Sequence, residues 1–433
     1  MKLLLKNGKV VSPASGLEGT LDILIDQGKI QKIQPQLTAP GARVVNVSGL
    51  VVVPGFIDMH VHFREPGQED KETIETGSRA AARGGFTTVC CMPNTVPPND
   101  TAEVTRFIRT KARAAAVQVL PIAAVTKGLG GEQLTNMAEL ISAGAVAFSD
   151  DGRPVSNSQV MRQALEQSRL LSALVIDHCE DKSLSDEGVM HEGPQSHLLR
   201  LRGIPAAAED VMVARDIILA EMTGGRIHIA HLSTKGAVWL LREAKKRKVQ
   251  VTAEVTPHHL FLTDKACASY NTNLKVSPPL RSRQDAAALL AAVKEGLIDV
   301  FATDHAPHTA EEKGRGFDQA PFGINGLETA VSLFLDRLVN KKVLPLRQLV
   351  RMMSVRPAAL LGLKDKGALQ PGADADLTLL DLKRETVVDV QSFASKSRNS
   401  PFHGWKLKGL PVATIVGGRV AYPFDGRLPG EEA

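Results

Sequence analysis

Apolar runs alternate with stretches of helical periodicity through the middle of the chain. Eight such runs are bounded by Gly, Pro or polar clusters and have the length of strands. In chain order they cover residues 56–63, 86–93, 117–125, 145–151, 173–180, 226–233, 249–258 and 299–308. Between most of them the apolar residues recur at helical spacing, as in 101–116 and 283–297. Apolar strands that alternate with helices predict a parallel sheet covered on both faces, and eight repeats predict closure into a TIM-type (β/α)8 barrel.

The two ends of the chain follow a different pattern. Both contain short strand-like runs, and N-G and Q-G turn signals join those near the start. Neither end has enough strands for a stable β domain alone, so we expect the two to pack together as one small β-sandwich beside the barrel. The predicted domains are an N-terminal sandwich part (1–52), the barrel (53–364) and a C-terminal sandwich part (365–433).

Composition narrows the class of protein. Hydrophobic residues make up 43% and charged residues 23% of the 433 residues, which is typical of a soluble globular protein. The longest apolar runs, such as 286–293, are far shorter than the ~20 residues that span a bilayer. The first residues hold too few apolar side chains for a signal-peptide core. We therefore expect a cytoplasmic protein with no membrane partner.

Charge content disfavours one class of partner, and the cysteines show no disulfide or metal-binding spacing. The net charge of +5 is spread along the chain, and residues 242–250 form its only dense basic run. Aromatic residues make up only 4% and are not interleaved with that run, so nucleic-acid binding is disfavoured. A mild positive balance suits an anionic substrate. The four cysteines form no C-x-x-C pair and are interpreted as buried free thiols.

Titratable residues gather at the carboxyl ends of the predicted strands, where a (β/α)8 barrel has its active site. His60 and His62 end the first strand, and residues two apart share a face with Cα atoms roughly 6.5 Å apart. His178, His231 and Asp304 end the fifth, sixth and eighth strands. One buried histidine is usually a satisfied core residue, but four with an aspartate predict a divalent ion such as zinc. Such an ion would lower the pKa of a bound water from ~15.7 to about 7.

Seven motifs together resemble the dihydroorotases, which are cyclic amidohydrolases of the amidohydrolase superfamily. They are PGFIDMHVHFREPG, CMPNT, DHCED, AHLST, NLKVSPPLR, ATDHAPH and APFGINGLET, and the resemblance covers nearly the whole chain. It implies a metal-dependent hydrolase acting on cyclic amides, which interconverts (S)-dihydroorotate and N-carbamoyl-L-aspartate in pyrimidine synthesis. It also implies one or two Zn²⁺ per subunit, with ligands His60, His62, Asp151, His178, His231 and Asp304.

The fourth predicted strand departs from much of that superfamily, in which a carboxylated lysine bridges two metals. Here no lysine lies between Lys127 and Lys182, and the adjacent acids Asp150 and Asp151 stand at the strand end. One branch of the dihydroorotases has this pattern, and there the second aspartate is a metal ligand. Strand parity favours the same choice, because Asp151 shares a face with small residues that suit a crowded barrel interior.

The substrate carries a ring carboxylate, which a guanidinium can bind bidentately. Arg64 directly follows the ligands of the first strand, although a rim salt bridge is the alternative for it. The resemblance assigns Arg64, Asn94 and His308 to the carboxylate or ring, with the backbone around Pro321 and Gly323 closing on the ring. Asn273 is a further candidate amide donor, and Asn94 taken alone would be interpreted as a turn residue. The long Gly-rich and charged segment 306–328 is a candidate lid.

The resemblance further implies that Asp304 acts as the general acid and base. Two alternatives remain open. The first is another cyclic amidase, a hydantoinase or allantoinase, and the F-R-E-P-G arginine and the missing lysine argue against it. The second is a non-catalytic scaffold for aspartate carbamoyltransferase, and the filled ligand positions argue against it. We expect a homodimer, with aspartate carbamoyltransferase as a candidate partner.

Overall fold

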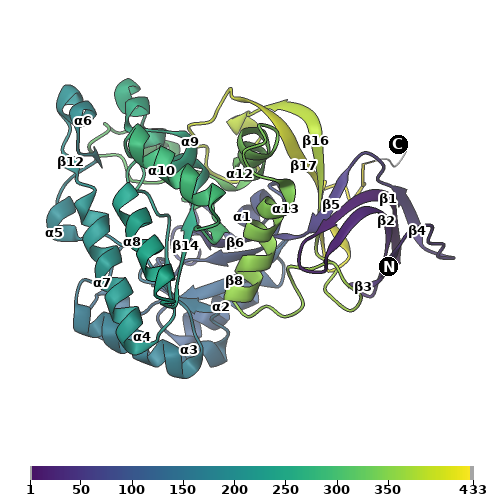
Figure 1. Cartoon of the computed structure of the whole chain (residues 1–433), viewed down its shortest axis with the longest axis horizontal. Coiled ribbons are helices and arrows are strands. Elements are labelled where there is room, and N and C mark those ends of the chain that lie inside the picture. The colour runs from purple at the N-terminus through teal and green to yellow at the C-terminus, as the bar shows by residue number, and fades with distance from the viewer. Residues whose placement is uncertain (1, 430–433) are drawn as a thin grey trace.

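A parallel eight-stranded barrel forms the centre of the computed structural model, which describes residues 2–429 (Figure 1). The strands follow one another around the barrel in chain order, so the predicted fold class is confirmed. Their bounds are β6 (Phe56–Val61), β7 (Phe86–Cys91), β8 (Gln118–Ala123), β9 (Ala147–Phe148), β10 (Val175–Asp177), β13 (Ile227–Ile229), β14 (Val251–Val255) and β15 (Val300–Phe301).

Helices surround the barrel on its outside, as Figure 1 shows. Threonine side chains accept backbone N–H groups at the first turns of α1, α2 and α8, which satisfies donors that a helix start leaves open. The longer helices are α1 (Ile74–Arg83), α2 (Ala102–Ala112), α3 (Met137–Ala143), α4 (Ser158–Leu171), α7 (Ala207–Thr223), α8 (Lys235–Lys246), α10 (Arg283–Lys294) and α12 (Leu327–Phe334). Shorter elements are α5 (Lys182–Ser185), α6 (Pro194–Leu199), α9 (Pro257–Phe261), α11 (Ala310–Lys313), α13 (Leu346–Val350) and α14 (Arg356–Leu360), with the strand pair β11 (Met190–His191) and β12 (Gly203–Ile204).

The barrel closes between β6 and the residues that follow β15. Val61 forms a parallel bridge with His305, and the backbone N–H of His62 donates to the His305 carbonyl at 2.8 Å. The carboxylate of Asp58 also accepts the hydroxyl of Thr303 at 2.6 Å. The first and last strands therefore meet directly beside Asp304.

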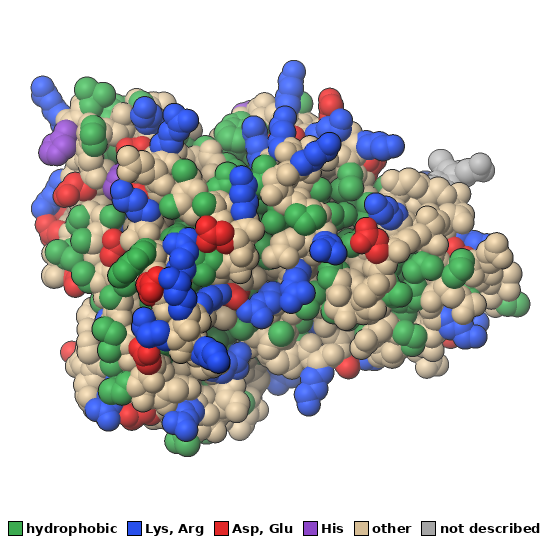
Figure 2. Space-filling view, viewed as in Figure 1, with side chains coloured by type: hydrophobic (Ala, Val, Ile, Leu, Met, Phe, Trp, Pro, Cys, Tyr) green, Lys and Arg blue, Asp and Glu red, His purple; other side chains and the backbone are tan. Residues whose placement is uncertain are grey.

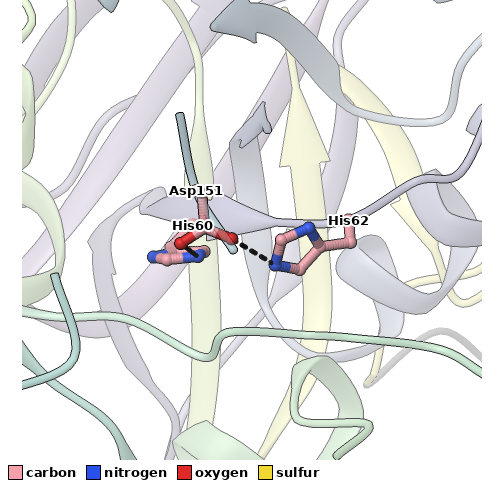
Figure 3. A group of neighbouring side chains, drawn as sticks. All are labelled: His60, His62 and Asp151. Atoms are coloured by element: carbon pink, nitrogen blue, oxygen red, sulfur yellow. Dashed lines mark ion pairs between the residues drawn. The ribbon is translucent and has the colours of Figure 1, made fainter. Parts of the chain in front are cut away.

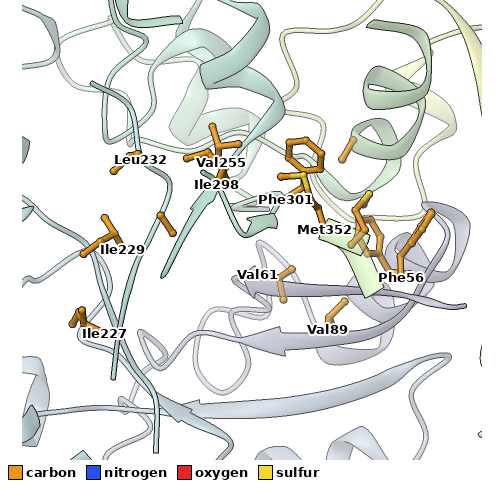
Figure 4. Close-up of a cluster of buried hydrophobic side chains, with 14 of the residues drawn as sticks. Phe56, Val61, Val89, Ile227, Ile229, Leu232, Val255, Ile298, Phe301 and Met352 are labelled. Carbon is orange, nitrogen blue, oxygen red and sulfur yellow. The ribbon is translucent and has the colours of Figure 1, made fainter. Parts of the chain in front are cut away.

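Buried apolar side chains fill the space between the barrel strands and the helices (Figure 4). Phe56, Val89 and Phe301 are fully buried in this cluster. The ring of Phe301 stacks on Phe334 of α12 with centroids 4.1 Å apart. Because protein interiors are close-packed, this core gives the strand ends little freedom to move.

The N-terminal and C-terminal parts of the described chain join in one further sheet of eight strands beside the barrel (Figure 1). β5 and β16 pair across the two ends, since residues 51–54 lie antiparallel to 377–380. Most pairs are antiparallel, but β1 runs parallel to both β4 and β5. A separate apolar core packs inside this domain. Its strands are β1 (Leu3–Ser12), β2 (Leu17–Asp26), β3 (Lys29–Gln34), β4 (Arg43–Asn46), β5 (Val51–Pro54), β16 (Leu377–Val387), β17 (Lys406–Val416) and β18 (Arg419–Tyr422).

Several barrel strands are shorter than the sequence pattern predicts. β9 ends at Phe148 and β15 at Phe301, so the acids that follow them lie in loops. His231 and Asp304 have φ angles of 30° and 47°, a left-handed conformation that cannot continue a strand. The prediction that these residues end strands is therefore wrong in detail, and backbone turns orient their side chains.

The surface carries no obvious single-sign patch on the face drawn in Figure 2. Lys and Arg side chains there are spread among acidic and neutral ones. Within residues 2–429, none of the helices combines the length and apolar character that a bilayer crossing requires.

Candidate metal centre and active site

Two histidines from β6 and its exit point into one buried space. The ring centroids of His60 and His62 lie 5.3 Å apart. Figure 3 draws both rings beside the carboxylate of Asp151, and their Nε2 atoms lie 3.4 Å and 3.5 Å from its two oxygens. Asp304 approaches the same space, with its Oδ1 3.1 Å from the Nε2 of His62. The four side chains can therefore converge on one ion.

A second pair of histidines lies on the other side of Asp151. The Nδ1 of His178 and the Nε2 of His231 are 2.9 Å apart, and they lie 3.6 Å and 3.5 Å from Oδ1 of Asp151. The other ring nitrogen of His178 pairs with Glu180 at 2.9 Å. Asp151 thus lies between two histidine pairs, and two groups of potential ligands share its carboxylate.

The neighbouring acid has a different environment. The carboxylate of Asp150 accepts the backbone N–H groups of Val125 and Thr126 at 2.8 Å and 3.1 Å, and the hydroxyl of Thr126. Burial raises the pKa of Asp150 to about 6. Burial also opposes ionisation of Asp151, but the neighbouring imidazoles, His60 first and then His178 and His231, outweigh it and hold the pKa of Asp151 well below its usual range. Both acids follow the end of β9 at Phe148, and Asp151 begins a turn with Gly152, so strand parity does not apply to them.

The donor set fits a divalent metal ion. His60 Nε2, Asp151 Oδ1 and His231 Nδ1 are buried without a hydrogen-bond partner among the described residues. Buried polar atoms rarely lack a partner, and a bound cation would give the unpaired His60 and Asp151 atoms one. Imidazole nitrogens with carboxylate oxygens are ligands that zinc and related ions prefer.

A cavity of about 380 Å³ opens onto this cluster. His60 is fully buried beneath the cavity and does not line it. The structure brings most of the other sequence-predicted site residues to the wall, namely His62, Arg64, Asn94, Asp151, His178, His231, Asp304, His308, Pro321 and Gly323. Asn273 is the exception, because it lies in the short turn Thr272–Leu274 and its chain neighbours Val276 and Ser277 reach the wall instead.

Arg64 is a buried cation in this wall. Its side chain donates to the carbonyl of Pro307 at 3.3 Å and lies 3.4 Å from Nε2 of His308. Within residues 2–429 the guanidinium forms no ion pair with a carboxylate, so the rim salt bridge is not observed. A buried guanidinium without a direct ion pair is costly, and an anionic ligand would relieve that cost. Burial, aided by the charge of Arg64, lowers the pKa of His308 to about 3.

Asn94 contacts a histidine of the cluster as well as the cavity. Its Oδ1 lies 2.8 Å from Nδ1 of His62, so the ring donates to the amide oxygen and keeps Nε2 free for an ion. The Nδ2 hydrogens of Asn94 remain as donors for a ligand in the cavity that the residue lines.

The candidate lid is anchored in this structure. Lys313 is buried and donates to the carbonyls of Thr272 and Pro321, both at 2.9 Å. Gly323 has a φ of 150°, and a Cβ there would lie 2.7 Å from the carbonyl oxygen of Ala306. The backbone N–H of Gly323 already donates to Lys275, so this segment forms a fixed wall with its hydrogen-bonding groups engaged.

Sequence reasoning missed one carboxylate of the site. Glu254 in β14 is fully buried, and one of its oxygens lies 2.7 Å from Nδ1 of His60. Its other oxygen lies 3.2 Å from Nε2 of His228, which is also fully buried. The sequence signal for Glu254 was a single acid within the strand-like run 249–258. A charged residue buried in such a run needs hydrogen-bond or ionic partners.

Comparisons with known proteins agree with this geometry. The family model described as "Dihydro-orotase-like" matches residues 49–237. A dihydroorotase of Pelotomaculum thermopropionicum is 57% identical over 97% of this chain and 98% of its own length. One of Syntrophus aciditrophicus is 50% identical over 98% and 100%. Among solved structures, the L-hydantoinase (dihydropyrimidinase) of Arthrobacter aurescens superposes with a TM-score of 0.87 at 28% identity, over 96% of this chain and 95% of that one.

The free energy of unfolding should fall as the pH drops below about 6.5. Burial, with the neighbouring imidazole of His258 as a smaller cause, keeps the pKa of His259 well below its usual value. The unfolded chain therefore takes up a proton that the folded chain does not, which costs up to about 1.4 kcal/mol per pH unit for this group. Denaturant titrations at pH values above and below about 6.5 would measure how steeply the free energy of unfolding changes with pH.

His259→Gln should give a shallower slope than the wild-type protein. The exposed His197 provides the matched control, and His197→Gln should keep the wild-type slope. Parallel slopes for wild type and His259→Gln would contradict the prediction.

Proposed function

Since this chain belongs to the dihydroorotase family, we propose that it interconverts (S)-dihydroorotate and N-carbamoyl-L-aspartate, a step of pyrimidine synthesis. It is a metal-dependent hydrolase acting on cyclic amides. The observation that carries the proposal is the buried Arg64, which faces the cavity beside the histidine and aspartate cluster. A cation without a carboxylate partner in the described chain suits a substrate that brings its own carboxylate.

We assign the metal centre to the residues that converge on Asp151. The proposed ion is Zn²⁺, with one position beside His60 and His62 and a second beside His178 and His231. When bound, such ions polarise the amide carbonyl and activate water. The complete proposed ligand set is His60, His62, Asp151, His178, His231 and Asp304.

The proposed substrate contacts follow from the cavity wall. Arg64 holds the ring carboxylate, and the Nδ2 of Asn94 and the ring of His308 support it. The segment with Pro321 and Gly323 packs over the ring as a wall, since its backbone groups already have partners. Plain hydantoins lack the carboxylate, which is why Arg64 argues against the hydantoinase alternative.

Asp304 is the proposed proton carrier. Its carboxylate lines the cavity, and its Oδ1 lies 3.1 Å from the Nε2 of His62. In hydrolysis it takes a proton from the attacking water and delivers that proton to the leaving amide nitrogen. In cyclisation the same carboxylate works in reverse, so one residue serves as base and acid.

We further propose a cytoplasmic homodimer that is active alone. Aspartate carbamoyltransferase is the candidate protein partner, and light scattering of mixtures with it would detect a complex. A scaffold without catalysis is disfavoured, because the proposed ligand positions are all filled by donors.

A substrate panel tests the proposed function. The zinc-loaded protein should cyclise N-carbamoyl-L-aspartate and hydrolyse dihydroorotate, with little activity on hydantoin, dihydrouracil or allantoin.

Arg64→Gln should raise KM for dihydroorotate, because the bidentate carboxylate contact is lost. Cyclisation assays with and without aspartate carbamoyltransferase separate an autonomous enzyme from a scaffold. Faster turnover of unsubstituted hydantoins than of dihydroorotate would overturn the proposal.

Asp304→Asn should lower turnover by about 100-fold or more, since the amide cannot relay the proton. Zinc content measured by atomic emission should stay near that of the wild type, because the histidines and Asp151 remain. Near-normal turnover in the zinc-loaded variant would contradict the proton-carrier role.

Zinc loading and activity should not depend on bicarbonate. The chain has no lysine between residues 127 and 182 that carbon dioxide could modify at this strand end. Apoprotein reloaded with Zn²⁺ in carbon-dioxide-free buffer should match a sample reloaded with added bicarbonate, whereas Asp151→Ala should bind less zinc in both. Activation by bicarbonate would show that a carbamate contributes to the site.

A further inference from the structure

Glu254 of β14 contacts residues of β6 and β13 and the backbone of His231. Its Oε1 is 2.7 Å from Nδ1 of His60 on β6, and the backbone N–H of His231 donates to the same oxygen at 3.3 Å. Its Oε2 is 3.2 Å from Nε2 of His228 on β13. The carboxylate is fully buried, so it has no water to replace these partners.

The hydrogen bond to Nδ1 determines how His60 can act. An imidazole that donates its Nδ1 proton to a carboxylate has its lone pair on Nε2. In His60 that Nε2 atom points toward Asp151 at 3.4 Å and has no hydrogen-bond partner among the described residues. A carboxylate behind the ring also increases the electron density that the imidazole offers to an ion.

His228 completes the environment of this carboxylate. Its Nδ1 lies 2.8 Å from the hydroxyl of Thr252, which leaves Nε2 to donate to Glu254. His228 is fully buried and does not line the cavity. Its contacts therefore orient Glu254 and leave the substrate space untouched.

The hydrogen bond from the backbone N–H of His231 to Glu254 stabilises an unfavourable backbone conformation. His231 has a φ of 30°, which is unfavourable for a residue with a side chain. The bond from its backbone N–H to Glu254 helps to hold this turn, which points the imidazole at Asp151 at 3.5 Å. One carboxylate therefore supports a histidine from each of the two pairs.

We propose that Glu254 is a positioning residue of the metal centre, which fixes the tautomer and orientation of His60 and holds the turn at His231. The inference rests on the proposed metal centre. The neighbouring ligand has a different kind of partner, because His62 donates to the neutral amide of Asn94. His60 is thus the histidine of this pair that has a charged partner behind it.

Glu254→Gln keeps the volume and one acceptor but removes the charge. Competition with a chromophoric chelator should show Zn²⁺ affinity about 10- to 100-fold weaker than that of the wild-type protein. The matched control is Asp22→Asn, in β2 of the sheet that the two ends of the chain form. Its buried carboxylate also accepts backbone N–H groups, those of Asn7 and Leu37, each at 2.8 Å. The control should bind zinc as the wild type does.

Wild-type zinc affinity in folded Glu254→Gln, with the control unchanged, would overturn the inference and leave the proposed function intact. A wild-type protein that fails to bind Zn²⁺ would overturn both. Nitrogen-15 NMR of the zinc-loaded wild type, labelled in histidine, provides a test that does not require a variant to fold. His60 should carry its proton on Nδ1, and an unprotonated Nδ1 would contradict the positioning role.

Discussion

A single short carboxylate lies between two pairs of histidines, and the rest of the structure depends on that constraint. Asp151 lies within 3.4–3.6 Å of ring nitrogens from His60, His62, His178 and His231. A carboxylated lysine could reach the same space from further away. The shorter aspartate side chain leaves little room for variation in the position of its backbone. The four strand ends must therefore be held closely in register, which a packed and closed barrel can do.

Buried acids provide much of that register. Asp58 ties β6 to Thr303 next to Asp304, and Asp150 ties the chain directly before Asp151 to the exit of β8. Glu254 ties β14 to histidines on β6 and β13. Each acid is buried and hydrogen-bonded to another strand or its exit, so the same interaction that satisfies a buried charge also positions a residue of the proposed metal centre. The cavity wall differs, since Arg64 forms no direct ion pair with a carboxylate within residues 2–429 and can bind an anionic ligand.

Much of the fold could be predicted because its pattern is local. Apolar strands, helical spacing and turn residues repeat eight times, and they specify a barrel without any knowledge of contacts. The histidines could be located because strand order alone brings carboxyl ends to one rim. Less local features could not be predicted. The left-handed turn at His231, the partner of Glu254 and the exclusion of Asn273 from the cavity depend on side chains far apart in the sequence. Strand parity supported the choice of Asp151 over Asp150 as the residue that faces the metal centre. In the structure β9 ends at Phe148, so the backbone beyond the strand directs the two side chains.

The position of bound zinc tests the shared role of Asp151 most directly. Crystals of the zinc-loaded protein, measured on both sides of the zinc absorption edge, would show where the ions lie. Anomalous density should appear on both sides of Asp151, with one peak beside His60 and His62 and the other beside His178 and His231. Zinc bound elsewhere, or a centre in which Asp151 is not a ligand, would contradict this arrangement.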